Sequence, residues 1–368
     1  MGKLGISLYP EQSTFEADKA YLERAKNYGY ERLFLSLLQL DASDTEGKGF
    51  QQFLDTLTYA KYLGYEVGID VNPHVLTQMG VDSSKLETFT EMGADIIRLD
   101  NETSAVDEAR MTHNALGLSI ELNMSQGTRH LDAIMSYSPD KSQLIGSHNF
   151  YPHRFSGLGL AHFNQCNAIF KQYNLRTMAF VNSQAATFGP WPMPDGLCTL
   201  EMHRTMDLVS QVKHLKLVDA IDDIVIANAY ASDDELRLAA EAFNALHTTL
   251  RMVFNAEATA IEREIILNNL HSYRGDHSDY MIRSSWMREL YKTADIPAHT
   301  NQTIHAGDVI VNNSNYLRYK GEMQIALQEM PADERVNVVG HIVADDHILF
   351  ENMHPWSAFQ IVDVQDKE

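Results

Sequence analysis

Polar side chains follow several short apolar segments of this sequence, and three pairs of them share one spacing. The pairs are Asp70 with Asn72, Arg98 with Asp100, and Glu121 with Asn123. Residues two positions apart lie on one face of a β-strand, so each pair would face one side of a sheet and the apolar residue between them the other. Because an unpaired carboxylate is costly to bury, several carboxylates beside an arginine indicate a functional site. The alternative is a buried network in which Arg98 only neutralises its neighbours.

Several carboxylates with asparagine and aromatic side chains nearby are typical of carbohydrate chemistry. Glycoside hydrolases commonly use two carboxyl groups, which lie about 5–5.5 Å apart in retaining enzymes and about 6.5–9.5 Å apart in inverting ones. We therefore predict that the set Asp70, Asp100 and Glu121 contains the general acid. A 2-acetamido sugar can supply its own nucleophile, so retaining, inverting and substrate-assisted mechanisms all stay open.

Other polar residues stand near the ends of the apolar segments, and we predict that they bind the substrate. They are Tyr9, Glu11, Asn72, Arg98, Asn123, His148, Asn149, Tyr151, Asn182 and Asn228. The chain has 16 histidines, but none of them has the H-x-x-x-H or H-E-x-x-H spacing of a zinc site. Its two cysteines form no Cys-rich motif. We therefore predict that no metal and no organic cofactor is required.

These side chains need a scaffold that brings strand ends together, and the sequence predicts one. Eight β-prone segments alternate with helix-like segments: Lys3–Leu8, Arg32–Leu37, Glu66–Val71, Asp95–Leu99, Leu118–Leu122, Ser142–Gly146, Thr177–Val181 and Asp223–Ala227. The clearest helix-like segments are Thr14–Tyr28, Phe50–Leu63, Ser84–Glu91 and Leu160–Tyr173. This alternation predicts an α/β fold, a (β/α)₈ TIM barrel whose catalytic groups lie at the carboxyl ends of the strands. An open doubly wound sheet is the alternative, but no Gly-rich dinucleotide fingerprint follows any strand.

The pattern changes near residue 244, where short β-prone pieces and polar turns begin to dominate. The β-prone pieces are Asp308–Val311, Met323–Leu327, Val336–Val343 and Phe359–Val364. We predict a barrel domain over residues 1–243 and a smaller, mostly β domain over residues 252–368.

The charge of the chain limits the kinds of partner. With 29 Lys and Arg against 50 Asp and Glu, the formal net charge is −21, which argues against nucleic acid or an anionic membrane as the main partner. The sequence contains no recognisable signal peptide and no apolar run long enough to span a bilayer, so we expect a cytoplasmic protein. It does not predict the oligomeric state.

Four segments of the chain resemble the 6-phospho-N-acetylmuramidase family. They are Gly5–Glu11, His148–Pro152, Gly196–Arg204, and, in the second domain, Gly307-Asp308 with the stretch from Asn312 to Glu322. The resemblance implies an N-terminal TIM barrel and a C-terminal cyclophilin-like β domain. It also implies that the enzyme cleaves a disaccharide, 6-phospho-N-acetylmuramic acid β-1,4-linked to N-acetylglucosamine, in cytoplasmic peptidoglycan recycling, a part of cell wall turnover.

A 6-phosphate on the substrate needs a local basic pocket in so acidic a protein. Arginine suits this role because its guanidinium donates two parallel hydrogen bonds to phosphate oxygens. We predict that at least one of Arg154, Arg204 and Arg318 binds the phosphate. Each of the three could instead form an ordinary surface ion pair.

Two other functions fit the same sequence. The first is a different sugar-phosphate barrel enzyme, such as an isomerase or an aldolase. An aldolase usually needs a Schiff-base lysine or a metal, and the predicted strand ends offer neither. The second is a non-catalytic carbohydrate-binding protein.

Overall fold

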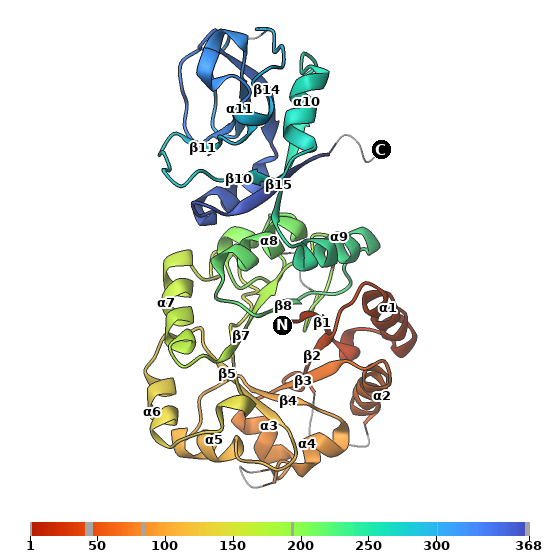
Figure 1. The fold of residues 1–368 in the computed structure, drawn as a ribbon. Helices are drawn as coiled ribbons and strands as arrows, with labels where there is room; N and C mark the ends of the chain where they lie inside the picture. The colour runs from red at the N-terminus through yellow and green to blue at the C-terminus, as the bar shows by residue number, and fades with distance from the viewer. Residues whose placement is uncertain (1, 41–46, 82–84, 193–194, 300, 365–368) are drawn as a thin grey trace. The chain divides into compact units, whose positions relative to one another are not determined.

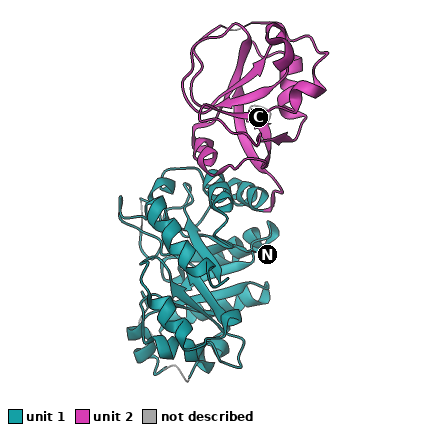
Figure 2. Ribbon diagram, turned by 60° about the vertical axis from the view of Figure 1, so that its left-hand side comes forward, with its two compact units in different colours: residues 1–243 teal, residues 244–368 magenta. Residues whose placement is uncertain are grey.

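The computed structural model describes residues 2–40, 47–81, 85–192, 195–299 and 301–364. The chain divides into two compact units, Met1–Phe243 and Asn244–Glu368, which are coloured separately in Figure 2. Among the described residues, no helix is both long and apolar enough to cross a membrane.

The first unit is a closed barrel of eight strands that follow one another in chain order (Figure 1). The strands are β1 Leu4–Leu8, β2 Arg32–Ser36, β3 Glu66–Val71, β4 Ile96–Leu99, β5 Ser119–Asn123, β6 Leu144–Ser147, β7 Arg176–Val181 and β8 Asp223–Ile226. All neighbours are parallel, and β1 closes the barrel by pairing Leu4 with Ile224 of β8. The predicted TIM barrel is confirmed, and the open sheet is excluded.

Helices follow the barrel strands. They are α1 Phe15–Asn27, α2 Lys48–Tyr62, α3 Pro73–Gln78, α4 Glu87–Met92, α5 Ala105–Met111, α6 His130–Ser136, α7 Leu160–Lys171, α8 Leu208–Val218 and α9 Asp233–Asn244. The Thr14 side chain caps α1 by accepting a hydrogen bond from the amide of Ala17, as its residue type favours. The predicted helix-like segment Ser84–Glu91 starts at a residue outside the described ranges, and α4 occupies its later part.

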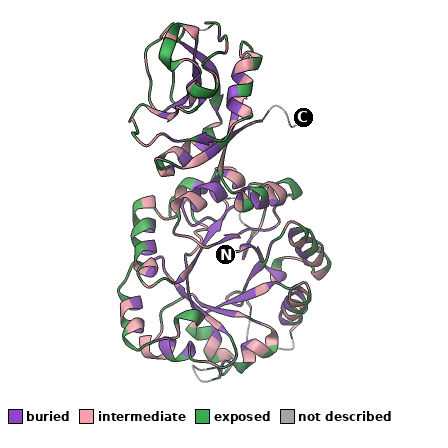
Figure 3. Cartoon of the chain, in the orientation of Figure 1, coloured by how far each residue is buried: buried purple, intermediate pink, exposed green. Residues whose placement is uncertain are grey.

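The strand faces follow the two-residue alternation of the sequence. Asp70, Arg98 and Glu121 are register partners on β3, β4 and β5, so they form one row across three strands. The apolar residues beside them, such as Ile69 and Ile97, are buried in the core shared with the helices. Figure 3 shows the barrel strands mainly as buried. The row of charges therefore lies on the opposite strand face, inside the barrel.

A second set of charges lies inside the barrel at the start of the strands. Arg32 opens β2 and donates hydrogen bonds to Glu121 and to Asp223, and all three side chains are almost fully buried. Arg176 Nη2 adds an ion pair with Asp223 Oδ2 at 2.6 Å and another with Glu66 Oε2 at 2.7 Å. Opposite charges thus compensate one another through the barrel interior.

The second unit contains a seven-stranded sheet in the order β10-β15-β9-β14-β12-β13-β11. Its elements are β9 Thr248–Phe254, α10 Ala260–Leu267, β10 His271–Ser272, β11 Met281–Ser284, α11 Met287–Leu290, β12 Asp308–Asn312, β13 Met323–Ala326, β14 Val336–Ile342 and β15 Ala358–Asp363. The pairing is antiparallel except between β9 and β15. The predicted mostly β character is confirmed. The sequence prediction overlaps β12 to β15 but misses β9, β10 and β11.

Replacing Arg32 by alanine should destabilise the barrel strongly. The change leaves the buried carboxylates of Glu121 and Asp223 without their shared cation, and breaking a buried ion pair on one side costs about 3–5 kcal/mol. Urea unfolding followed by circular dichroism should show this loss. Arg237→Ala, which removes a helix-surface ion pair with Asp234, is the matched control and should leave the midpoint nearly unchanged. Equal midpoints for both variants would contradict the assigned role of Arg32.

Candidate active site

A cavity of about 170 Å³ opens at the carboxyl ends of several barrel strands. It is lined by Ser36, Leu38, Gln39, Asp70, Arg98, Asp100, Asn149, Phe150, Pro152, Pro190 and Trp191. Two predicted catalytic residues, Asp70 and Asp100, therefore face one cavity, together with the predicted substrate-binding residues Arg98 and Asn149. The carboxyl end of the strands is where TIM-barrel enzymes carry their active sites.

Arg98 is the residue that holds this site together. Its Nη1 donates to Asp70 Oδ1 at 2.5 Å and to Asp100 Oδ1 at 3.3 Å. Its Nη2 donates to the side-chain oxygen of Asn149, and its Nε donates to Ser147 Oγ at 3.0 Å. The guanidinium is nearly fully buried, so its position is fixed by these partners.

Asp70 has an unusual protonation equilibrium for an aspartate paired with arginine. Burial disfavours its charged form and raises its pKa to about 6, although the nearby Arg98 guanidinium acts in the other direction. The neighbouring carboxylate of Asp100 contributes to the rise. An acid with a pKa near neutrality can hold and release a proton under the conditions in which an enzyme works.

Glu121 lies deeper in the barrel than the two aspartates and does not line the cavity. One of its carboxylate oxygens accepts from Arg32, and the other, Oε1, lies 3.8 Å from Arg98 Nε. Oε1 accepts no hydrogen bond from the part of the chain that the structure describes. Glu121 contacts both buried arginines, Arg32 and Arg98. It therefore links the charges at the barrel mouth to those at the start of the strands.

Glu11 and Tyr9 follow β1 at the same end of the barrel. Tyr9 is fully buried in an apolar cluster with Phe34 and Phe180, and its hydroxyl donates to the carbonyl of Ala227 at 2.5 Å. Neither carboxylate oxygen of Glu11 accepts a hydrogen bond from the described residues. Burial raises the pKa of Glu11 to about 7. Glu11 is thus a second carboxyl group with a pKa near neutrality.

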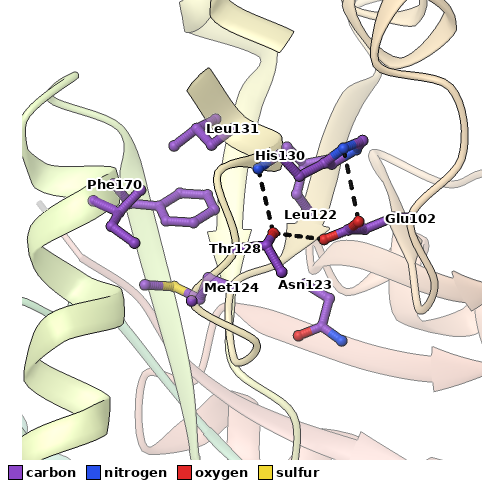
Figure 4. Close-up of a pocket in the computed structure, with 10 residues that line it drawn as sticks. Glu102, Leu122, Asn123, Met124, Thr128, His130, Leu131 and Phe170 are labelled. Atoms are coloured by element: carbon purple, nitrogen blue, oxygen red, sulfur yellow. Dashed lines mark hydrogen bonds and ion pairs between the residues drawn. The ribbon is translucent and has the colours of Figure 1, made fainter. Parts of the chain in front are cut away.

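Asn72 and Asn123 support the backbone in this structure. Asn72 Oδ1 accepts from the amide of Val75 and caps α3, while Asn123 Nδ2 donates to the carbonyl of Asp100 at 3.1 Å. Asn123 also lines a separate cavity of about 20 Å³, shown in Figure 4. There Glu102 accepts a hydrogen bond from Thr128, and its Oε2 lies 3.7 Å from His130 Nδ1 (Figure 4). That cavity has room for about one water molecule and not for a sugar.

His148 and Tyr151 flank Asn149 but have different surroundings. The His148 ring is fully buried, stacks on Phe163, and bonds through Nε2 to Asn167 Oδ1 at 2.9 Å. Burial lowers the pKa of His148 to about 4, so the ring is neutral near pH 7. Tyr151 is half-buried, and its backbone pairs with Cys198 in the loop after β7.

The loop after β7 is fixed by amide side chains and by Arg204. Asn182 Oδ1 accepts from the amide of Leu197, and Asn228 bonds both backbone groups of Ser183. Arg204 forms two hydrogen bonds of 2.7 Å with the Glu201 carboxylate and four more with backbone carbonyls. Because its N–H groups all donate to this loop and its surroundings, Arg204 holds the loop in place.

The two other predicted phosphate ligands are more accessible. Arg154 is exposed and forms one ion pair, between its Nε and Asp195 Oδ1, at 2.7 Å. It lines a cavity of about 110 Å³ together with Asn182, Asn228 and Arg204. Arg318 belongs to the second unit, where it is exposed within the 3₁₀ segment Ser314–Tyr319.

Sequence reasoning missed several contributors to the mouth of the barrel, among them two serines and a tryptophan. Ser36 ends β2 and lines the cavity, Ser147 ends β6 and bonds Arg98, and Trp191 lies in the loop after β7. The signal for both serines was available, because each is a polar residue that ends an apolar strand. Among the described residues, no three His, Cys, Asp or Glu side chains gather in an arrangement that could hold a metal ion.

Two family models match the chain. The model described as 6-phospho-N-acetylmuramidase, N-terminal, matches residues 4–241, and the model described as its C-terminal counterpart matches residues 248–362. The two matches therefore cover nearly all of both units. A search of curated proteins found no match.

Two solved structures are similar over almost the whole chain. An uncharacterized B. cereus protein is 42% identical with a TM-score of 0.90, over 98% of this chain and 99% of that chain. A conserved protein of unknown function from Enterococcus faecalis is 24% identical with a TM-score of 0.76, over 98% of this chain and 96% of that chain. At its lower identity, the second match supports the fold alone.

Glu11→Gln should flatten the pH dependence of stability. The folded protein holds the Glu11 proton more tightly than the unfolded chain, because the pKa rises from 4.5 to about 7 on folding. The free energy of unfolding therefore falls as the pH rises through this window, and glutamine removes that contribution. Urea unfolding at several pH values between 4.5 and 8 measures the slope. Glu91→Gln, at an exposed site, should keep the wild-type slope. An unchanged slope in Glu11→Gln would refute the assignment.

Proposed function

The chain belongs to the 6-phospho-N-acetylmuramidase family, and we propose that it hydrolyses the β-1,4 bond of a disaccharide made of 6-phospho-N-acetylmuramic acid and N-acetylglucosamine. The family is one of glycosidases, so this chain is a glycosidase. The exact substrate and the residues below are our proposal. The observation that carries it is the convergence of Asp70, Asp100, Arg98 and Asn149 on one cavity at the barrel mouth.

Asp70 is the proposed general acid. Hydrolysis of a glycosidic bond requires a proton on the departing oxygen, and Asp70 faces the cavity with a pKa of about 6. Arg98 bonds one oxygen of this carboxyl, Oδ1, at 2.5 Å. The same bond stabilises the carboxylate that remains after the proton has been transferred.

Asp100 is the proposed second carboxylate. It lines the same cavity, and its Oδ1 lies 3.3 Å from the nitrogen of Arg98 that also bonds Asp70. One arginine thus orients both aspartates toward the cavity. Depending on the mechanism, Asp100 activates water, attacks the sugar, or orients the 2-acetamido group.

Glu121 is proposed to act through Arg98 and to position it. Its carboxylate lies between Arg98 and Arg32. It does not line the cavity, whereas Asp70 and Asp100 do. The side chains of Asn149, Phe150 and Trp191 complete the cavity as polar and apolar contacts for a sugar ring.

Asp70→Asn and Asp100→Asn should each lower kcat by about 10²–10⁴ without loss of fold. Product release from the phosphorylated disaccharide measures the rate, and circular dichroism checks the fold.

The wild-type kcat/KM should fall as the pH rises above about 6, because Asp70 then loses the proton that it donates. The Asp70→Asn variant should lack this decline. Asp55→Asn, an exposed change on α2, is the control and should keep full activity.

Glu121→Gln and Glu11→Gln decide between the candidate acids. Glu121→Gln should reduce kcat less than Asp70→Asn does, because Glu121 contacts Arg98 rather than the cavity. Near-normal turnover in both aspartate variants, with a large loss in Glu11→Gln, would transfer the role of the acid to Glu11. A largest loss in Glu121→Gln would make Glu121 the catalytic carboxylate.

Arg154 is the phosphate ligand that we favour among the three arginines. Arg204 already donates to Glu201 and to four carbonyls, whereas Arg154 is exposed beside a cavity and, among the described residues, pairs with Asp195. Barrel enzymes frequently bind phosphate near strands seven and eight, where Asn182 and Asn228 of this cavity lie.

Arg154→Ala should lower kcat/KM for the phosphorylated disaccharide by about 10²-fold, through loss of a charge-assisted hydrogen bond to phosphate. Cleavage of the unphosphorylated disaccharide, where measurable, should change little. Arg129→Ala removes an arginine of the same unit that pairs with Asp132, and it should leave both rates unchanged. Equal losses on both substrates in Arg154→Ala would place the phosphate elsewhere, with Arg318 as the next residue to test.

Three further parts of the proposal follow from the family resemblance. They are the cyclophilin-like character of the second domain, a cytoplasmic location, and a role in peptidoglycan recycling. Each stays a prediction alongside the substrate itself.

A further inference from the structure

The β unit holds a cavity of its own, with a volume of about 530 Å³. It is lined by Ser278, Met281, Arg283, Ile304, Ile310, Asn312, Tyr316, Tyr319, Glu322, Gln324, Met330, Pro331, Ala332, Asp333 and Val336. Cavities that bind small molecules commonly measure roughly 300–1,000 Å³ and combine apolar walls with a few polar groups. The proposed glycosidase chemistry does not use any of these residues.

A buried carboxylate with spare acceptor capacity lines this cavity. Glu322 is fully buried, and its Oε1 accepts from Arg283 Nε at 2.7 Å and from Gln324 Nε2 at 3.0 Å. Its other oxygen, Oε2, lies 3.7 Å from Arg288 Nη1 and accepts no hydrogen bond from the described residues. This oxygen is buried, and it lacks the donor that a ligand reaching it would supply.

A second buried acceptor lines the same cavity. The side chain of Asn312, at the end of β12, is 1% exposed, and its Oδ1 also accepts no hydrogen bond within the described parts of the chain. Buried acceptors without donors are costly and uncommon in folded proteins. Two of them on one cavity indicate a ligand that carries several hydrogen-bond donors.

Aromatic and apolar side chains form much of the remaining wall. Tyr316 and Tyr319 pack edge to face with their ring centroids 5.3 Å apart, and both line the cavity. Met281, Ile304 and Met330 are further lining residues. Such walls suit a ligand with a flat apolar face next to its donors.

The charges at the cavity disfavour a strongly anionic ligand. Arg283 is the one cation among the described lining residues, and it is engaged by Glu322. Asp333, which also lines the cavity, pairs with Arg335. The site therefore offers acceptors and compensated charge rather than a free positive centre.

We propose that this cavity binds a neutral sugar ring. The hydroxyl and amide N–H groups of the sugar would donate to Glu322 Oε2 and Asn312 Oδ1, and the apolar face of the ring would rest on the tyrosines. Four of the lining residues, Asn312, Tyr316, Tyr319 and Glu322, lie within one eleven-residue stretch of the sequence, residues 312–322. The site lies entirely within the β unit and does not depend on the barrel chemistry.

Methyl NMR of the full chain tests the proposal directly. N-acetylglucosamine is the probe, because it is a neutral pyranose with hydroxyl and N–H donors. Among the 16 methionines of the chain, Met281 and Met330 line this cavity, whereas Met178 is buried in the barrel. Titration of ¹³C-methyl-methionine protein should shift the Met281 and Met330 signals, assigned by leucine substitution, and leave the Met178 signal in place.

Variants separate this site from the barrel. Tyr319→Ala and Glu322→Gln should each weaken binding at Met281 and Met330 by at least about tenfold. Asp70→Asn, in the barrel cavity, should leave these shifts unchanged. The control Tyr62→Ala removes an exposed aromatic residue of the barrel unit and should also have no effect.

Several results would overturn the proposal. They are the absence of shifts at Met281 and Met330 at saturating sugar, shifts that persist in Tyr319→Ala, and shifts that disappear in Asp70→Asn. A short peptide or inorganic phosphate that moves these signals where the sugar does not would also overturn it. If Glu322→Gln fails to fold, Tyr319→Ala alone decides the outcome.

Discussion

The ion-paired arginine inside the barrel is the constraint on which the rest of the site depends. Arg98 is buried on β4, and a buried guanidinium is tolerated only with anionic partners and hydrogen-bond acceptors around it. Asp70, Asp100 and Glu121 supply the charge, and Asn149 supplies a neutral acceptor. Since well-packed apolar residues often serve a barrel interior equally well, stability alone is a weak reason for this arrangement. Asp70, Arg98 and Asp100 also line a cavity at the strand ends, which gives a functional reason for keeping these charges.

The two ends of the charged row differ in how completely the charges are compensated. At the lower end, Arg32 is held between Glu121 and Asp223, and neither carboxylate lines the cavity at the barrel mouth. At the upper end, a single guanidinium serves both Asp70 and Asp100. Burial, assisted by the nearby carboxylates of Asp100 and Glu121, raises the pKa of Asp70. The charges around Arg32 thus form a fixed, paired end of the row, and Asp70 at the mouth is the group that can hold a proton.

Short-range patterns in the sequence were sufficient to predict the barrel and the row of charges. Asp70 and Asn72, like Arg98 and Asp100, are two positions apart, which predicted that each pair faces one side of its strand. The observed register, in which Asp70 pairs with Arg98, agrees with this prediction. The partner of Glu121 could not be predicted in this way, because Arg32 lies 89 positions earlier and opens its strand instead of ending it. The many bonds of Arg204 to loop carbonyls likewise arise only when the loop after β7 is folded. The sequence prediction lacks strand β9, which begins among residues 244–251, between the two predicted domains.

Long-range attraction cannot bring the proposed phosphorylated sugar to so acidic a protein. With 50 acidic against 29 basic residues, the overall field repels anions, so affinity has to come from a few arginines close to the ligand. Many of the arginines inside the barrel unit already have structural partners, Arg32, Arg98 and Arg204 among them. For the proposed phosphorylated substrate this favours an exposed arginine such as Arg154, whose one bond to Asp195 a ligand phosphate would replace. Two features therefore restrict where an anion can bind. The protein is acidic overall, and its buried arginines already pair with carboxylates.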